Sequence, residues 1–249
     1  MSISPQQIST SQISVNGIAI EVTRKPIKNL HLGVYPPEGQ VRVTAPPHIS
    51  DDAIRLAAIG KLAWIKRQQT NFQAQPRQSE REMVSGESHY FLGQRYLLQV
   101  VELDKKQRKS HIVLQGRSTM TIYVKPNTTS EKRLEIIQKW YREQLKALIP
   151  TMLDKWAAIV GVEITDWGIK KMKTKWGSCN IEEKRIWLNL ELVKKPLHCI
   201  EYIIVHELVH LLERNHCDRF KSVLDKVMPQ WRLFRDELNS LPLGHDNWK

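Results

Sequence analysis

Three histidines and a glutamate fall within one short apolar stretch, V205-H206-E207-L208-V209-H210-L211-L212-E213-R214-N215-H216. His206 and His210 are four residues apart, a spacing that stacks them on one face of an α-helix with Cβ atoms about 5–6 Å apart. Glu207 lies about 100° further round the helix axis. The two imidazoles can therefore reach one metal ion, and Glu207 can reach a water molecule beside it.

A metal site of this kind needs a third donor, and His216 is the nearest candidate. It lies six residues beyond His210, or about 600° of helical turn, so a continuous helix would carry it to another face. We therefore expect the helix to end before His216. Asn215 tolerates the left-handed backbone conformation that ends helices. The three histidines match the metzincin spacing, but Glu213 stands where that pattern has glycine.

This motif also arises by chance, and two solvated histidines on a helix would need no metal. The apolar residues around them predict burial, however, and buried imidazoles would otherwise lack partners. We therefore expect one Zn²⁺ per chain on His206, His210 and His216, with a fourth position open for water. Glu207 is the expected general base. Cys179 and Cys217 are expected to be structural.

A short motif upstream of the histidines, K175-W176-G177-S178, is expected to bind substrate. The strand predicted near 167–175 would offer a sheet edge along which a peptide can pair as an additional strand. Gly177 would allow close approach of the backbone. Trp176 either lines a pocket or covers the core.

Hydrophobic periodicity predicts an α+β fold with a β-rich first half that contains one helix. Alternating residues between 18 and 45 predict a β-meander, and Ser50 is expected to cap the helix that follows. Strands resume between 89 and 124.

The second half is predicted to be more helical. A 3- to 4-residue period from Ser130, which can cap, predicts a helix that stops at Gly161. The histidine helix then follows a small antiparallel pair of strands, 167–175 and 185–190. We expect a seam near residue 125, which separates a β-rich region, 1–125, from a second domain, 126–249.

The chain is basic: 38 Lys and Arg against 26 Asp and Glu give a formal charge of +12. This excess favours an anionic partner, either nucleic acid or a nucleotide, although a merely soluble surface would show it too. No apolar run reaches the ~18 residues of a membrane span, and the N-terminus lacks signal-peptide features. Three cysteines without C-x-x-C spacing favour a reducing compartment. We expect a cytoplasmic protein with no membrane partner.

Several motifs together resemble the YgjP-like metallopeptidase family, which is similar to the SprT and WLM groups of zincin-like proteases. The resemblance covers almost the whole chain, and it implies a zincin-like catalytic half with zinc on the three histidines and Glu207 as the base. Val209 and Cys217 depart from residues frequent in the family. The matching segments are R24-K25, V41–P46, A63-W64-I65, M172–C179, I186–L190, Y202–L211 and N215–F220.

The resemblance leaves the substrate open. A zinc-dependent metallopeptidase acting on polypeptides is the first hypothesis, and the basic surface would suit proteins associated with nucleic acid. A metal-dependent pyrophosphatase that hydrolyses nucleotide phosphoanhydrides is the second, although a Gly-rich phosphate loop is missing from the sequence. A DNA-associated binding module with structural zinc is the third.

Overall fold

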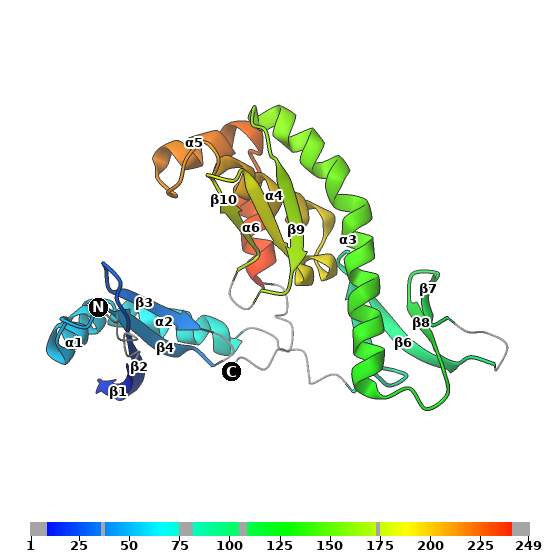
Figure 1. Cartoon of the computed structure of the whole chain (residues 1–249), viewed down its shortest axis with the longest axis horizontal. Helices are drawn as coiled ribbons and strands as arrows, with labels where there is room; N and C mark the ends of the chain where they lie inside the picture. The colour runs from blue at the N-terminus through cyan, green and yellow to red at the C-terminus, as the bar shows by residue number, and fades with distance from the viewer. Residues whose placement is uncertain (1–8, 36–37, 75–81, 105–108, 173–174, 241–249) are drawn as a thin grey trace, which may run out of the picture. The chain divides into compact units, whose positions relative to one another are not determined.

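The structure is a computed structural model that describes residues 9–35, 38–74, 82–104, 109–172 and 175–240 (Figure 1). The chain divides into two compact units, with the main boundary between residues 76 and 77. The fold is α+β, as predicted, with six α-helices and three small sheets among the described residues. None of the described helices is long and apolar enough to cross a membrane.

The first unit is a four-stranded sheet followed by two helices. Alternate strand residues are buried together with Ile54, Ala58 and Ile65 of the helices, so the unit has a hydrophobic core of its own. Ser50 caps the first helix as predicted, because its side chain accepts a hydrogen bond from the Ala53 N–H at 3.2 Å. The elements are β1 (Ser9–Val15), β2 (Ile18–Arg24), β3 (His31–Tyr35), β4 (Gln40–Ala45), α1 (Asp51–Gly60) and α2 (Leu62–Ala74).

The strands of this sheet are not in the order of a meander, so that prediction was wrong. Their order is β1-β2-β4-β3, in which β2 and β4 run parallel while the other two pairs are antiparallel. Hydrophobic alternation indicates which side chains of a strand face the core. It does not indicate which other strand pairs with that strand.

The second unit begins with a sheet of the same topology. Its order is β5-β6-β8-β7, again with one parallel pair in the centre. A long helix follows; Thr129 caps it in place of the predicted Ser130, and Gly161 ends it with a left-handed φ of 77°. These elements are β5 (Ser88–Phe91), β6 (Gln94–Glu102), β7 (His111–Gln115), β8 (Thr119–Val124) and α3 (Ser130–Val160).

Strands β5–β8 share one core with the C-terminal half of the chain. Leu98 and Ile122 of the sheet belong to the same buried cluster as Leu145 of α3, and α3 extends along both sheets of the unit (Figure 1). The Tyr141 hydroxyl donates a hydrogen bond to the Tyr90 carbonyl at 2.8 Å. The division between the units therefore lies near residue 76, and it does not coincide with the seam that the change of secondary structure predicted near 125.

The last part of the second unit places a buried helix beside a three-stranded sheet. The sheet has the order β10-β11-β9 and is mixed. The antiparallel pairing expected for 167–175 with 185–190 was wrong, because β9 runs parallel to β11, and the antiparallel partner of β11 is β10. Helix α4 buries nine of its 13 residues, as an apolar helix inside a core does. The elements are β9 (Asp166–Lys170), β10 (Gly177–Asn180), β11 (Arg185–Asn189), the 3₁₀-helix η1 (Leu190–Lys194), α4 (Leu197–Val209), α5 (Asp218–Val227) and α6 (Trp231–Ser240).

Candidate metal centre

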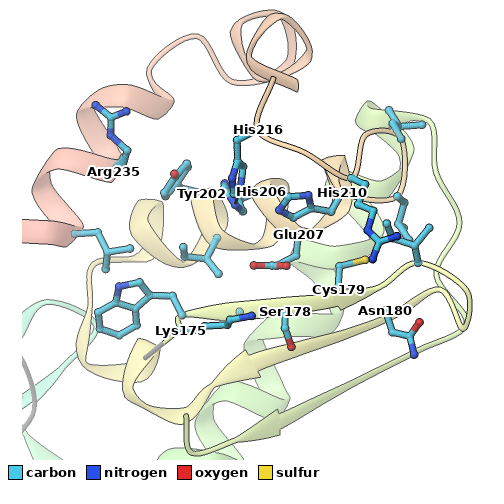
Figure 2. Close-up of a pocket in the computed structure, with 18 of the residues that line it drawn as sticks. Lys175, Ser178, Cys179, Asn180, Tyr202, His206, Glu207, His210, His216 and Arg235 are labelled. Carbon is cyan, nitrogen blue, oxygen red and sulfur yellow. Dashed lines mark hydrogen bonds between the residues drawn. The ribbon is translucent and has the colours of Figure 1, made fainter. Parts of the chain in front are cut away.

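Three imidazoles converge at the C-terminal end of α4 (Figure 2). The ring centroids of His206 and His210 are 4.9 Å apart, as expected for residues one turn apart on a helix. The ring of His216 lies 4.9 Å from that of His206 and 4.8 Å from that of His210. One nitrogen of each ring lies within 4.8 Å of the others, so the three side chains together can hold one metal ion.

The chain brings His216 back by ending α4 early. The helix stops at Val209 with His210 as its C-cap, and α5 begins at Asp218. Asn215 is absent from the residues with positive φ, so the expected left-handed break at that residue was wrong. Helical turns at residues 210–212 and a bend at 214–215 redirect the chain instead.

A buried aromatic ring that the sequence analysis missed supports the three imidazoles. Phe220, on the first turn of α5, has its ring centroid 5.0, 4.8 and 4.8 Å from those of His206, His210 and His216. The position of α5 thereby fixes the distance between His216 and the histidines of α4. Its sequence signal is weak, because a Phe at this place also fits the apolar face of an amphipathic helix.

The chemistry of these donors fits a divalent cation. The Nδ1 of His210 lies 3.1 Å from the Glu213 carbonyl oxygen; as that oxygen can only accept, Nδ1 carries the hydrogen and the Nε2 lone pair is free to bind. The Nε2 atoms of His206 and His216 are 3.0 Å apart. Burial, with the two neighbouring imidazoles, lowers the pKa of His206 to about 3, and burial also lowers that of His210. Neutral imidazoles are the form that binds metal.

One ring nitrogen of His206 lacks the hydrogen-bond partner that a buried structural histidine would have. Its Nδ1 is buried without a hydrogen bond to any described residue, although buried polar atoms in folded proteins are nearly always paired. The free-energy cost of burying an unpaired nitrogen is tolerated where the side chain has a functional role.

Glu207 is buried beside the imidazoles, with only 5% of its surface exposed. It lies directly against the backbone of β10: a Cβ at Gly177 would be 2.6 Å from Oε1 and 2.7 Å from Cγ of Glu207. Only glycine leaves room for the carboxyl group there. Burial raises the pKa of Glu207 to about 8, and the charge of Lys175 opposes this rise.

Replacing Gly177 with Ala is expected to displace the Glu207 carboxyl group, because the added methyl would overlap it. A displacement of about 1 Å in an active site can lower the rate by roughly 100-fold, so we expect a 10- to 100-fold loss of kcat/KM with unchanged zinc content. Gly60→Ala is the matched control, since its Cβ would meet nothing within 4 Å. If Gly177→Ala retained full activity, the position of Glu207 would not matter for catalysis.

A second residue that the sequence analysis missed holds the segment before β10. The buried Asn189 donates hydrogen bonds from Nδ2 to the carbonyl oxygens of Met172 and Lys175, at 3.0 and 2.8 Å. Its Oδ1 accepts from the N–H groups of Met172 and Glu191, at 3.3 and 3.2 Å. No local pattern signals the contacts to Met172 and Lys175, because these residues lie 17 and 14 positions away in the chain.

The four residues expected to bind substrate all line one cleft with the histidines and Glu207, of about 1000 Å³. Lys175 is exposed, whereas Gly177 is buried against Glu207. Trp176 makes both of the expected contacts, because it lines the cleft and also packs on the core. The Lys195 ammonium lies 5.2 Å from its ring centre. Ser178 is half-buried on β10.

Strand β10 is an edge strand of its sheet. The Asn189 N–H donates to the Trp176 carbonyl at 2.8 Å, which makes this opposed pair a hydrogen-bonded one. In an antiparallel ladder such pairs alternate with pairs that are not bonded. The backbone N–H and C=O groups of Gly177 and Cys179 therefore point away from β11. The free edge beside Glu207 belongs to β10, which comes later in the chain than the predicted 167–175 strand.

A second group of metal-binding residue types, His198, Cys199 and Glu237, needs no metal to explain it. His198 Nε2 lies 2.6 Å from Glu237 Oε2, and the Cys199 thiol donates to the Phe234 carbonyl at 3.7 Å. Burial and the charge of Glu237 raise the pKa of Cys199 to about 12, which keeps the thiol protonated. Each side chain thus has a partner, and together they connect α4 with α6.

The family model described as "YgjP-like, metallopeptidase domain" matches residues 28–241. The chain belongs to the YgjP-like metallopeptidase family. Membership of this family makes the protein a hydrolase, with a divalent metal and polypeptide substrates implied. The match confirms the resemblance on which the sequence analysis relied.

Two solved structures are similar to part of this YgjP-like chain. The metallopeptidase zymogen abylysin of Pyrococcus abyssi is 22% identical, with a TM-score of 0.34 over 35% of this chain and 89% of its own. The metallopeptidase zymogen jannalysin of Methanocaldococcus jannaschii is 24% identical, with a TM-score of 0.33 over 36% and 92%. A search of curated proteins found no match.

Proposed function

We propose that the chain is a zinc-dependent peptidase in which His206, His210 and His216 hold one zinc ion and Glu207 transfers the proton. The observation that carries the proposal is the convergence of three imidazoles beside a buried carboxyl group in one open cleft. Membership of the YgjP-like family supports the reaction class.

Each side chain has a defined task in this proposal. Zinc, when bound, is a Lewis acid that polarises a peptide carbonyl and lowers the pKa of water. The positive charge of a bound ion would favour the ionised form of Glu207 and so oppose the burial that raises its pKa to about 8. In that form, Glu207 accepts a proton from the attacking water at a carboxylate oxygen and passes it to the leaving amine nitrogen. Gly177 keeps that carboxylate in place. The hydrogen bond from His210 Nδ1 to the Glu213 carbonyl fixes which nitrogen of this imidazole faces the ion.

The substrate is proposed to bind along the free edge of β10. Its outward N–H and C=O groups, at Gly177 and Cys179, can pair with an extended peptide as an added strand would. Lys175, Trp176 and Ser178 lie next to or on this strand and line the same cleft, so they would contact the side chains of the bound peptide.

Peptide hydrolysis is favoured over the two other hypotheses. The family match supports peptidase activity, and it gives no support to nucleotide hydrolysis or to DNA binding through structural zinc. The charge of +12 remains compatible with substrates that are associated with nucleic acid, and this part of the proposal is tested by adding DNA.

The test is cleavage of an unstructured protein such as casein by the purified full chain. We expect cleavage to stop after treatment with a chelator and to return when one equivalent of zinc is added. The assay is repeated with and without DNA, and phosphate release from nucleoside triphosphates is measured in parallel. Cleavage that resists complete removal of metal would contradict the proposal. Zinc-dependent phosphate release without proteolysis would replace it with the pyrophosphatase hypothesis.

A further inference from the structure

The two ends of the cleft differ in charge. Tyr202, on α4, and Lys175, before β10, mark one end, and His210 and Asn180 mark the other (Figure 2). We name them the Tyr202 end and the Asn180 end. The residues are arranged in this way because α4 and β10 run in the same direction past each other. Gly177 lies against Glu207 between the two ends.

The Tyr202 end carries two cations and lacks a carboxylate among its described lining residues. Lys175 is exposed and forms no ion pair with a described residue, although its charge acts on Glu207. Arg235 pairs with Asp236, its neighbour in sequence, at 2.8 Å. Asp236 is not among the residues that line the cleft, and its side chain is 65% exposed, so water screens this pair strongly. Both cations thus remain available to a ligand.

The Asn180 end has no excess of positive charge among the described residues that line it. Ile181 and Glu182 follow Asn180 directly, while Leu212 and Arg214 follow the end of α4. Glu182 and Arg214 carry opposite charges, so they cancel formally. Ile181 and Leu212 remain 37% and 43% exposed despite their size, and both line the cleft. This end is suited to an apolar side chain.

We infer that the proposed peptidase prefers substrates that carry a carboxylate, which binds at the Tyr202 end between Lys175 and Arg235. The inference rests on the proposed function and names its substrate class. Arginine and lysine form their strongest hydrogen bonds with carboxylates. The ring of Trp231 lies 5.2 Å from the Arg235 guanidinium and restricts its position. The carboxylate comes from an Asp or Glu side chain or from the C-terminus of the peptide.

The test compares quenched-fluorescence peptides of one sequence, in which a single position is Asp, Asn or Lys and is scanned along both sides of the cleaved bond. Each peptide is made with a free and with an amidated C-terminus, which separates the two sources of the carboxylate. We expect at least one position, or the free terminus, to raise kcat/KM about tenfold over the neutral peptide. The preference should weaken in 0.5 M salt, because exposed charges are screened.

Substitutions then locate the preference. Lys175→Gln with Arg235→Gln should reduce it to about twofold or less. The matched control, Lys226→Gln with Arg219→Gln, removes the same charge from exposed residues outside the cleft and should leave the preference intact. Lys175→Glu with Arg235→Glu should reverse the preference toward the Lys peptide. A reversal cannot arise from misfolding, since it requires faster cleavage of one substrate.

The possible failures are distinct. Equal cleavage of Asp, Asn and Lys peptides by the wild-type enzyme would overturn the carboxylate preference alone. A DNA oligonucleotide that competes with the peptide in the wild type but not in the Lys175→Gln, Arg235→Gln variant, without any acidic preference, would assign these cations to nucleic acid. Absence of any peptide cleavage in the wild type would reject the proposed function itself.

Discussion

Glu207→Gln is expected to lower peptide hydrolysis by about 100- to 10,000-fold, because this is the range that general acid–base catalysis contributes. The amide has nearly the size and shape of the carboxyl group, so it fits against Gly177 in the same place. It cannot accept the proton from water, however. The variant should therefore keep its zinc and its melting temperature while turnover is lost.

The measurement is kcat/KM on a peptide that the wild type cleaves, together with zinc content and thermal unfolding. Glu163→Gln serves as the control, because Glu163 is exposed and lies outside the cleft. If Glu207→Gln retained more than about a tenth of wild-type kcat/KM, the loss would be smaller than general acid–base catalysis contributes. Another group would then accept the proton.

His216→Ala is expected to weaken zinc binding by more than about 100-fold. Loss of a residue that only orients a metal ligand through a hydrogen bond already lowers metal affinity by roughly 10- to 100-fold. His216→Ala instead removes one of the three proposed direct donors. The fold should survive, because His216 is exposed and lies between helices instead of within one. Competition of the protein with a chromophoric chelator gives the affinity.

His198→Ala is the matched control for this prediction. It removes an imidazole from the other cluster, in which the partner of His198 is Glu237, so zinc affinity should not change. Loss of zinc from His198→Ala instead of His216→Ala would show that the metal binds between α4 and α6.

The sequence was most informative where function depends on local helical geometry. Spacing alone put His206 and His210 on one face of a helix, because residues one turn apart always meet there. His216 lies close enough to His206 and His210 to share one ion with them, but the predicted route of the chain was wrong. Asn215 was expected to break the helix, whereas α4 had already ended at Val209. The path of the connecting segment depends on packing of α5, and on Phe220 in particular.

Features that depend on distant segments could not be predicted in the same way. Asn189 holds residues that are 14 to 17 positions away, and no periodicity reports such a contact. The change from strands to helices near residue 125 suggested a seam, yet Ile122 and Leu145 on its two sides share one core. A change of secondary structure says nothing about which surfaces pack together. The same limit explains why the strand order β1-β2-β4-β3 was taken for a meander.

X-ray absorption at the zinc edge, on the purified chain loaded with one equivalent of zinc, tests the three-histidine centre most directly. The account predicts one ion per chain with three imidazole nitrogens at about 2.0–2.1 Å, and loss of this signature in His216→Ala. A spectrum with sulfur ligands, or an unchanged imidazole count in His216→Ala, would contradict it.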